Sequence, residues 1–569
     1  MNHIQSYQKD ISIVICGEAG QGIQTIEQAL NSILKRAGYH VFSTKEFMSR
    51  IRGGMNSTQI RVASQPVNAF VQRIDICIPL EQGALKHLAK RLSKETAILG
   101  EKDKYDTDFV IHNVPISQIA NEAGGKIYAN AVAIGTVLGL FQTDPEIHRK
   151  YFKQLFAAKS ESIVENNIRA CERGYHFGND INLNDHLLKP IQKDENVKSE
   201  MIMDGAEAVT LGAIYGGCNF VSSYPMSPST GVLVNAAQYS HAFELVVEQA
   251  EDEISAINMS LGAWYAGARA LVTTSGGGFA LMEEGISLAG MIETPVVVHL
   301  AQRPGPATGL PTRTEQGDLN LALYAGHGEF PRIILAPGTM HEAFTLTHLA
   351  FNMADKFQVP VFILTDQFLM DSSYNLPVPD ISILQNNKYI VETDADYKRY
   401  KLTKDGLSPR GIPGYGKGTV AVDSDEHTES GYITENLDLR IKMVDKRLKK
   451  SKAIQRESIP PVFRGKENYE TLIVSWGTTF LPVREALEII DNPEIAMLHF
   501  PQVYPLPPQT KNYLDKASRI IVAEGNATGQ FRQLLALYSR AEIHDSILKY
   551  NGMPFAVEDI LEKLEALNV

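Results

Sequence analysis

Cysteine is scarce in this chain of 569 residues, and its four cysteines, Cys16, Cys77, Cys171 and Cys218, lie far apart. Because no CxxC pair occurs, the chain by itself offers neither a thiolate metal cage nor an iron–sulfur cluster. An excess of basic residues is also lacking, since 54 Lys and Arg stand against 66 Asp and Glu, a formal net charge of −12. Such an acidic chain gains little from a polyanion, so we expect no nucleic-acid binding.

Long apolar runs are absent as well. The best membrane candidate, residues 285–301, is interrupted by Glu293 and Pro295 before it reaches bilayer length. The first residues lack the basic and apolar regions of a secretory signal. We therefore expect a soluble cytoplasmic protein with no membrane association.

Strand-like runs alternate with helical periodicity along most of the chain, which is typical of parallel α/β domains. One such helix is expected at residues 128–141, which are apolar nearly all round. Gly, Asn and Pro concentrate near residues 175–195 and mark a boundary, and a long irregular stretch separates the second unit from the third. The basic run at residues 446–456 favours a solvated helix face, with a surface for an acidic partner as the alternative.

Glycine-rich and arginine-rich motifs mark the first unit. Gly17, Gly20 and Gly22 lie in CGEAGQG between a strand and a helix, a context that suits an anion at a helix N-terminus. The spacing is GxxGxG rather than the dinucleotide fingerprint GxGxxG, so a tight turn is the alternative to a bound phosphate or nucleotide. Arg50 and Arg52 in SRIRGG suit a carboxylate or phosphate, and an inter-subunit ion pair is an equal alternative.

Two loops of the second unit follow strand-like runs. YPMSPST, residues 224–230, holds Ser227 between two prolines that restrict the backbone. Ligands of parallel sheets bind at the carboxyl ends of strands, so we favour a functional loop over a plain helix start. SGGG, residues 275–278, follows another strand and allows a neighbour to approach bare backbone closely.

Charged residues supply further candidates. Acids cluster before a predicted helix, where they ordinarily complement the helix dipole, at Glu248, Glu251, Asp252 and Glu253. Arg303 precedes Pro-Gly-Pro and suits a small carboxylate, because its planar fork binds both oxygens; a salt bridge within the loop is the alternative. His327, between two glycines, is a weak candidate because a lone histidine is more often structural.

Together these motifs resemble the 2-oxoacid:ferredoxin oxidoreductases, specifically alpha subunits with a gamma-type domain fused to the N-terminus. The matching segments, in chain order, are GEAGQG, SRIRGG, YPMSPST, AEDEISAINMSLGAWYAGARA, TTSGGGFALM, QRPGPATGLPT, TEQGDL and DEHTESG. The resemblance implies a three-domain α/β chain. Its expected parts are a gamma-type domain at residues 1–190, a doubly wound pyrimidine-binding domain at 195–440 and a transketolase C-terminal-like domain at 465–569.

The resemblance also implies a reaction and residues for it. Such enzymes use thiamine diphosphate to decarboxylate a 2-oxoacid oxidatively, and with CoA they form acyl-CoA, carbon dioxide and reduced ferredoxin. Glu253 matches the glutamate that bonds the aminopyrimidine ring, and Arg303 matches the arginine that receives the substrate carboxylate. Ser227 stands where the family usually has threonine. The implied cofactor-binding residues are Tyr224, Pro225, Ser227, Glu253, Ser275 and Gly276, and the implied substrate-binding residues are Ser227, Arg303 and Thr308.

The family's metal-binding sequence, GDG followed by Asn, is missing from this chain. The resemblance therefore implies a beta subunit that supplies the diphosphate site, Mg²⁺ and a [4Fe-4S] cluster, in an (alpha–beta)₂ assembly that reduces ferredoxin; no metal is expected in this chain. The segments GPATGLPTRTEQGDL and YAGHGEF favour 2-oxoglutarate as substrate. Pyruvate, a branched-chain 2-oxoacid or an aryl pyruvate stays open, as does a non-redox scaffold that binds nucleotide or CoA.

Overall fold

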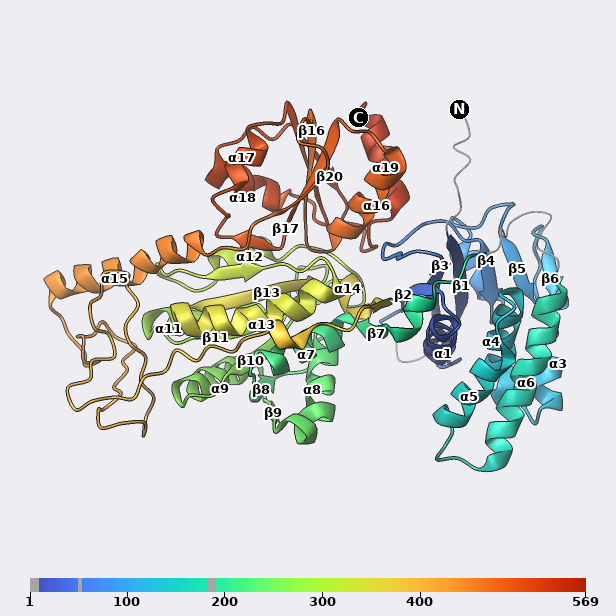
Figure 1. The fold of residues 1–569 in the computed structure, drawn as a ribbon, viewed down its shortest axis with the longest axis horizontal. Coiled ribbons are helices and arrows are strands. Elements are labelled where there is room, and N and C mark those ends of the chain that lie inside the picture. The colour runs from blue at the N-terminus through green and yellow to red at the C-terminus, as the bar shows by residue number, and fades with distance from the viewer. Residues whose placement is uncertain (1–9, 50–53, 182–190) are drawn as a thin grey trace. The chain divides into compact units, whose positions relative to one another are not determined.

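The computed structural model describes residues 10–49, 54–181 and 191–569. The chain forms two compact units, one of Met1–Met203 with Ser372–Val378 and one of Asp204–Asp371 with Pro379–Val569 (Figure 1). Three sheets of eight, seven and five strands, each with helices, confirm the predicted α/β class. The predicted domain boundaries at residues 190, 195, 440 and 465 stay a prediction.

The first unit is built on the eight-stranded sheet, with the order β6-β5-β4-β1-β3-β2-β14-β7. Strands β1, β4, β5 and β6 are parallel, whereas β3 runs antiparallel to both β1 and β2, so the sheet is mixed rather than purely parallel. The strands are β1 (Asp10–Glu18), β2 (His40–Glu46), β3 (Met55–Ala63), β4 (Ile76–Pro79), β5 (Ala97–Gly100), β6 (Ile111–Asn113), β7 (Met201–Asp204) and β14 (Ser373–Leu376).

Close helix packing holds this unit together. The predicted buried helix is confirmed as α4 (Ala129–Leu140), which packs along α6 (Glu161–Asp180). A Cβ at Gly135 or Gly139 would overlap carbonyl groups of α6, so glycine allows the two backbones to meet. The other helices are α1 (Ile23–Arg36), α2 (Gly83–Leu88), α3 (Ile116–Glu122) and α5 (Pro145–Leu155).

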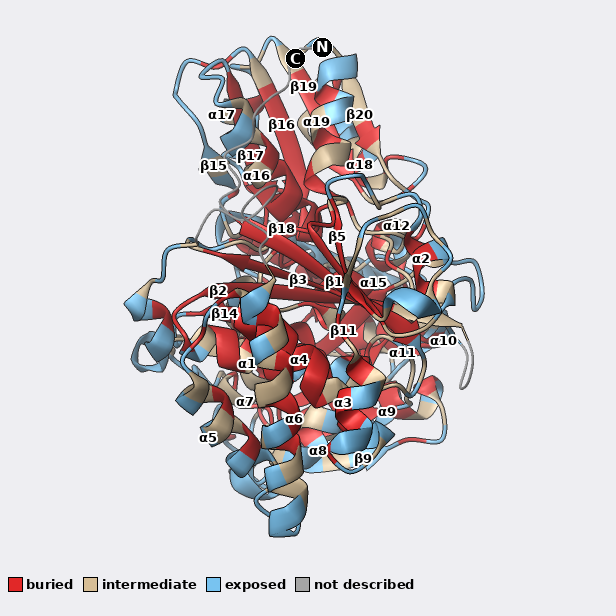
Figure 2. Ribbon diagram, turned by 90° about the vertical axis from the view of Figure 1, so that its right-hand side faces the viewer, coloured by how far each residue is buried: buried red, intermediate tan, exposed pale blue. Residues whose placement is uncertain are grey.

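The second unit contains the seven-stranded sheet, with the order β18-β12-β13-β11-β10-β8-β9. Its strands are parallel except β18. Most are buried on both faces, as β11 is in Figure 2, which is expected for a sheet covered by helices. They are β8 (Phe220–Ser223), β9 (Val246–Gln249), β10 (Ala270–Thr274), β11 (Val296–Gln302), β12 (Ile333–Leu335), β13 (Pro360–Asp366) and β18 (Gln502–Tyr504). The helices are α7 (Gly205–Tyr215), α8 (Thr230–Phe243), α9 (Glu253–Tyr265), α10 (Gly276–Leu281), α11 (Glu283–Met291), α12 (Leu319–Tyr324), α13 (Met340–Phe357) and α14 (Gln367–Asp371).

The five-stranded sheet belongs to the same unit and shares one apolar core with the seven-stranded sheet. Its strands are β15 (Val462–Arg464), β16 (Thr471–Trp476), β17 (Ile495–Phe500), β19 (Arg519–Glu524) and β20 (Asp545–Leu548). Its helices are α16 (Phe480–Ile490), α17 (Thr510–Leu514), α18 (Gln530–Ser539) and α19 (Val557–Ala566). β18 lies between these elements in sequence yet joins the larger sheet, which ties the two sheets together.

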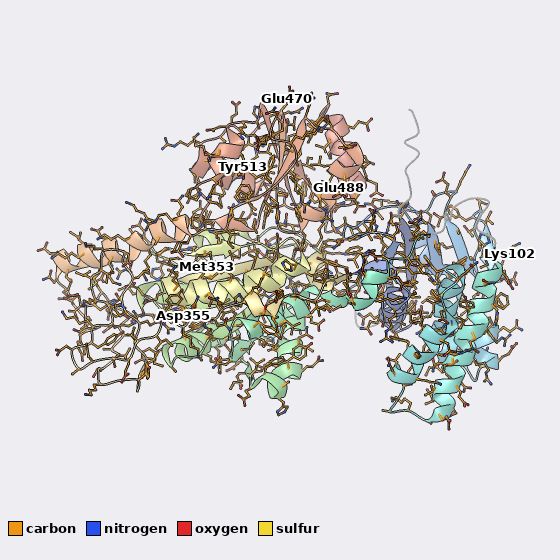
Figure 3. All side chains as sticks on the ribbon, in the orientation of Figure 1. Lys102, Met353, Asp355, Glu470, Glu488 and Tyr513 are labelled. Carbon is orange, nitrogen blue, oxygen red and sulfur yellow. The ribbon has the colours of Figure 1, made fainter. Side chains whose placement is uncertain are left out.

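The irregular stretch before α15 (Leu437–Arg456) is fixed by buried charges. Asp355, labelled on α13 in Figure 3, forms ion pairs with Arg269 and with Arg410 of this stretch. On α15, Lys446 and Lys450 are 1% exposed and both pair with Glu293. The predicted solvated face of the basic run is therefore wrong at these positions, because a buried carboxylate far away in the sequence receives the two ammonium groups.

Among the described residues, none of the helices combines the length and the apolar character needed to cross a bilayer.

Candidate active site

Four neighbouring strands of the second unit end at one edge of the seven-stranded sheet. β9, β8, β10 and β11 are parallel, so the segments that follow them emerge on the same side. These segments are α9 with its preceding loop, residues 224–229, the turn 275–278 and the loop 303–309. Parallel sheets bind ligands at this edge. The predicted site residues all lie in these four segments.

Glu253 is the first residue of α9 and only 3% exposed. Asp252 caps the helix instead, because its side chain accepts a hydrogen bond from Ser255 N–H at 2.7 Å. Glu253 Oε1 is buried and has no hydrogen-bond partner among the described residues. Burial raises the pKa of Glu253, and the charge of Asp252 adds to this against a hydrogen bond from its own backbone. A buried carboxyl oxygen without a partner suits a ring nitrogen of a ligand.

The turn after β10 requires glycine at two positions, because a carboxyl group lies close to the backbone at each of them. A Cβ at Gly278 would overlap Glu253 Oε1 and Thr274 Oγ1, and one at Gly276 would lie 2.6 Å from Asp318 Oδ2. Ser275 is fully buried, and its Oγ has no hydrogen-bond partner in the described part of the chain. Asp318 Oδ2 likewise has none among the described residues, so three polar atoms without partners surround this turn.

Arg303 joins the loop after β11 to the loop after β8. Its Nη1 donates a hydrogen bond to the backbone carbonyl of Ser227 at 2.6 Å. Burial lowers the pKa of Arg303, and the charge of Asp318 opposes this change. The guanidinium is therefore half-buried and held by a hydrogen bond at one nitrogen. It is also close enough to the turn to interact electrostatically with the carboxyl group of Asp318.

The remaining predicted residues lie at the rim of the same edge. Tyr224 is 41% exposed, Pro225 is half-buried, and both precede Ser227, which is exposed. Thr308 is exposed as well. Its neighbour Ala307 brings a carbonyl 4.0 Å from a Cβ built on Gly277, so the loop after β11 folds against the turn.

Asp318 is a site residue that sequence reasoning missed. Burial raises the pKa of its carboxyl to about 6, with the charge of Glu315 adding to this and that of Arg303 opposing it. Its backbone N–H donates to Gln302 Oε1 at 3.0 Å, at the end of β11. The motif TEQGDL contains this residue, but an acidic residue directly before a helix is ordinarily interpreted as a cap, so no separate signal marked it.

Other candidates lie away from this edge or outside the described residues. His327 lines a separate cavity of about 360 Å³ with Glu284 and Arg440. Arg50 and Arg52 lie outside the described residues. All four cysteines are buried, and burial raises the thiol pKa of Cys16 to about 12, which disfavours a thiolate nucleophile. No group of three or more His, Cys, Asp and Glu side chains within the described ranges is placed to hold a metal ion.

The glycine loop of the first unit opens onto a cavity of its own. Gly22 precedes α1 with a left-handed backbone, φ 76°, and Gly20 has φ 93°. The cavity measures about 570 Å³, and Lys104, Lys126 and Asn130 are among the residues that line it. The loop is therefore both a tight turn and one wall of a pocket of ligand size.

Two protein-family models match the chain. Residues 12–177 match the model described as pyruvate ferredoxin/flavodoxin oxidoreductase. Residues 211–446 match the thiamine diphosphate-binding model of pyruvate flavodoxin/ferredoxin oxidoreductase. The second match includes every predicted site residue of the seven-stranded sheet.

Known proteins resemble the chain over nearly its full length. A 2-oxoacid:ferredoxin oxidoreductase alpha subunit from Sulfolobus sp is 32% identical, over 97% of this chain and 96% of the relative. The 2-oxoglutarate oxidoreductase subunit KorA of Mycobacterium tuberculosis is 25% identical, over 97% and 90%. Among solved structures, 2-oxoglutarate:ferredoxin oxidoreductase from Magnetococcus marinus, with 2-oxoglutarate, coenzyme A and succinyl-CoA bound, matches with a TM-score of 0.91 and 29% identity, over 98% of this chain and 99% of that one.

Proposed function

Because this chain belongs to the family of 2-oxoacid:ferredoxin oxidoreductase alpha subunits, we propose that it provides the pyrimidine-binding half of a thiamine diphosphate site that decarboxylates 2-oxoglutarate. The observation that carries this proposal is the partnerless Oε1 of Glu253, buried at the start of α9 beside a bare glycine turn. Such an atom, together with the partnerless Ser275 Oγ, fits the polar edge of an aminopyrimidine ring. The domain division at residues 1–190, 195–440 and 465–569 is part of the proposal.

Glu253 acts on the cofactor's ring. Thiamine diphosphate, when bound, supplies a nucleophilic carbon and an electron sink for decarboxylation. Glu253 would hold a proton between its carboxyl oxygen and the ring nitrogen, and burial, which raises the pKa of this carboxyl, favours the protonated form. Tyr224, Pro225 and Gly276 form the walls around the ring, and none of them adds a charge.

Arg303 and the hydroxyl residues bind the 2-oxoacid. The guanidinium of Arg303 receives the carboxylate next to the oxo group, while Ser227 carbonyl keeps one nitrogen in place. Ser227 and Thr308 offer exposed hydroxyls on the two loops that face this position. The choice of 2-oxoglutarate rests on the relative from M. marinus, which binds it. Pyruvate and branched-chain 2-oxoacids are the alternatives.

A beta subunit completes the site. The segments that build the edge carry the exposed apolar side chains Tyr224, Ile254 and Met259, and the residues that follow two of these segments add Leu281 and Leu310. Exposed apolar side chains on the segments around a polar site suit a protein interface. We propose that the beta subunit docks here in an (alpha–beta)₂ assembly. It supplies the diphosphate site, Mg²⁺ and a [4Fe-4S] cluster, from which ferredoxin takes the electrons.

For the co-substrate CoA we propose the cavity beside Gly20 and Gly22 in the first unit. Its volume suits a ligand, and the ammonium groups of Lys104 and Lys126 suit phosphate. Lys126 is exposed, so Lys126→Ala should leave the fold intact. We expect this variant to raise KM for CoA about tenfold, the loss of one charge-assisted contact, without changing KM for the 2-oxoacid. An unchanged KM for CoA would place CoA elsewhere.

The decisive experiment is co-expression of this chain with the candidate beta subunit. The purified complex is tested for viologen reduction with a panel of 2-oxoacids, with and without thiamine diphosphate and CoA. We expect reduction that needs both compounds, with the highest kcat/KM for 2-oxoglutarate. If no 2-oxoacid supports reduction while ATP, NAD or CoA raises the melting temperature of the chain alone, the non-redox scaffold is the better description.

A further inference from the structure

Asp318 is a half-buried residue whose carboxyl group is not used by the helix that follows it. It stands directly before α12, the usual place of a capping residue, yet its side chain makes no capping hydrogen bond. Its Oδ2 is buried and without a hydrogen-bond partner among the described residues. A buried carboxyl oxygen without a hydrogen bond lowers the stability of the fold unless a ligand or another group interacts with it.

The carboxylate lies on the turn that carries the proposed cofactor site. A Cβ at Gly276 would lie 2.6 Å from Oδ2 and 2.7 Å from Oδ1 of Asp318. Ser275 Oγ and Glu253 Oε1, the other two partnerless atoms, border the same turn. Asp318 therefore faces the region where the proposed cofactor and substrate meet.

Asp318 and Arg303 interact through space rather than by contact. The charge of Arg303 opposes the rise in the pKa of Asp318, and the charge of Asp318 opposes the fall in the pKa of Arg303. Both residues are described in the structure, and no ion pair within 4.0 Å joins their side chains. A group of carboxylate size bound to Arg303 would therefore lie in the field of Asp318.

The loop that carries Asp318 is held rigidly by the five-stranded sheet. Gln316 Nε2 donates to the carbonyl of Trp476 at 2.9 Å, and its Oε1 accepts from Gly525 N–H at 2.7 Å. Gln316 N–H also donates to the carbonyl of Gly525 at 2.6 Å. These bonds anchor the loop to the ends of β16 and β19. Asp318, two residues further on, cannot move far from an approaching anion.

We propose that Asp318 destabilises the bound 2-oxoacid by facing its carboxylate on Arg303, and so promotes decarboxylation; this rests on the proposed function. In that step the bond between the carboxylate carbon and carbon 2 breaks. Its electron pair stays with carbon 2, and the carboxylate leaves as neutral carbon dioxide. The repulsion from Asp318 is present in the bound substrate and vanishes as the charge leaves, so it lowers the barrier at the expense of affinity.

Two substitutions of Asp318 test the inference in the co-expressed complex. Asn and Ser are both favoured before a helix, so Asp318→Asn and Asp318→Ser should keep the start of α12. We expect both to lower KM for 2-oxoglutarate about threefold and kcat about tenfold or more, the pattern of a removed ground-state strain. Glu329→Gln, which removes an exposed charge beyond α12, is the control and should keep both constants within about twofold.

The outcomes separate this inference from the proposed function. A wild-type complex without 2-oxoacid-dependent reduction overturns the proposed function, and the inference with it. With an active wild type, a raised KM or an unchanged kcat in the Asp318 variants overturns the inference alone. Failure of both variants to assemble, where Glu329→Gln assembles, also overturns it, because the carboxylate would then serve the fold.

Discussion

Glu253 and Gly278 touch across the candidate site, and glycine at 278 is what allows the carboxylate to lie there. A Cβ at this position would overlap Glu253 Oε1 and Thr274 Oγ1 and lie 2.7 Å from Glu253 Cγ. Both neighbours are buried, so an added methyl group would have to displace Glu253, Thr274 or both. The turn thus fixes where the carboxyl group points.

Gly278→Ala should therefore displace Glu253 and reduce 2-oxoacid-dependent viologen reduction about 100-fold, the effect of a misplacement near 1 Å. Gly277→Ala is the matched control. It adds the same methyl group one residue earlier, where the nearest atom is Ala307 O at 4.0 Å. Equal activities of the two variants would show that the position of Glu253 does not matter.

Replacement of the carboxyl group itself tests the chemistry. Glu253→Gln keeps the size of the side chain but cannot share a proton with a ring nitrogen in the same way. We expect a loss of activity of about 100- to 10,000-fold, the range of general acid–base catalysis. Glu251→Gln, an exposed position in the same segment, should change little. Size-exclusion chromatography checks assembly, and activity of Glu253→Gln within about threefold of wild type contradicts the role, given that range.

Arg303 should matter for the 2-oxoacid and not for CoA. Arg303→Ala removes a charge-assisted contact to the substrate carboxylate, so KM for 2-oxoglutarate should rise about 10- to 100-fold. Arg303→Lys keeps the charge but lacks the planar fork, so its KM for 2-oxoglutarate should lie between those of the wild type and Arg303→Ala. Initial rates at varied 2-oxoglutarate and varied CoA measure both constants. If KM for CoA rises in parallel, the substitution has disturbed the loop as a whole, and the hydrogen bond from Arg303 to the carbonyl of Ser227 then serves the fold.

Much of this edge could be predicted because a parallel sheet gathers its strand ends. The apolar strands before residues 224, 275 and 303 predict loops on one side of a sheet, and the structure has them there. The glycines at 276 and 278 predict that another residue approaches the backbone closely, but their spacing does not identify that residue. Asp318 was missed for that reason, since its contact with Gly276 bridges two separate segments.

The basic run of α15 shows the same limit. Lys446 and Lys450 have the spacing of an exposed helix face, and their sequence neighbours are polar. Their partner, Glu293, appeared only as an interruption of an apolar run. A carboxylate inside such a run is itself a signal, because a buried charge requires an opposite one, but the sequence does not identify which cation reaches it.

This buried cluster gives a stability prediction. Lys446 Nζ lies 2.6 Å from Glu293 Oε1, and Lys450 Nζ lies 2.5 Å from Oε2. Glu293→Gln leaves two ammonium groups buried without a carboxylate and should lower the free energy of unfolding by about 3–5 kcal/mol. Replacement of both lysines by Met in the Glu293→Gln variant should restore much of the lost free energy of unfolding. The two tryptophans, Trp264 and Trp476, both lie in the second unit, so their fluorescence in urea reports on this unit.

The cluster should also make this unit sensitive to acid. Burial alone would raise the pKa of Glu293, but the charges of Lys450, Lys446 and Arg399 outweigh it and hold the pKa far below the ordinary 4.5. A carboxyl with a lowered pKa in the folded state stabilises above its unfolded pKa and loses that contribution as the pH falls. The urea concentration at the unfolding midpoint of the wild type should therefore decrease when the pH is lowered below 4.5. In the variant with Glu293→Gln, Lys446→Met and Lys450→Met, this decrease should be smaller. An equal acid dependence in both proteins would mean that protonation of Glu293 contributes nothing to unfolding in acid.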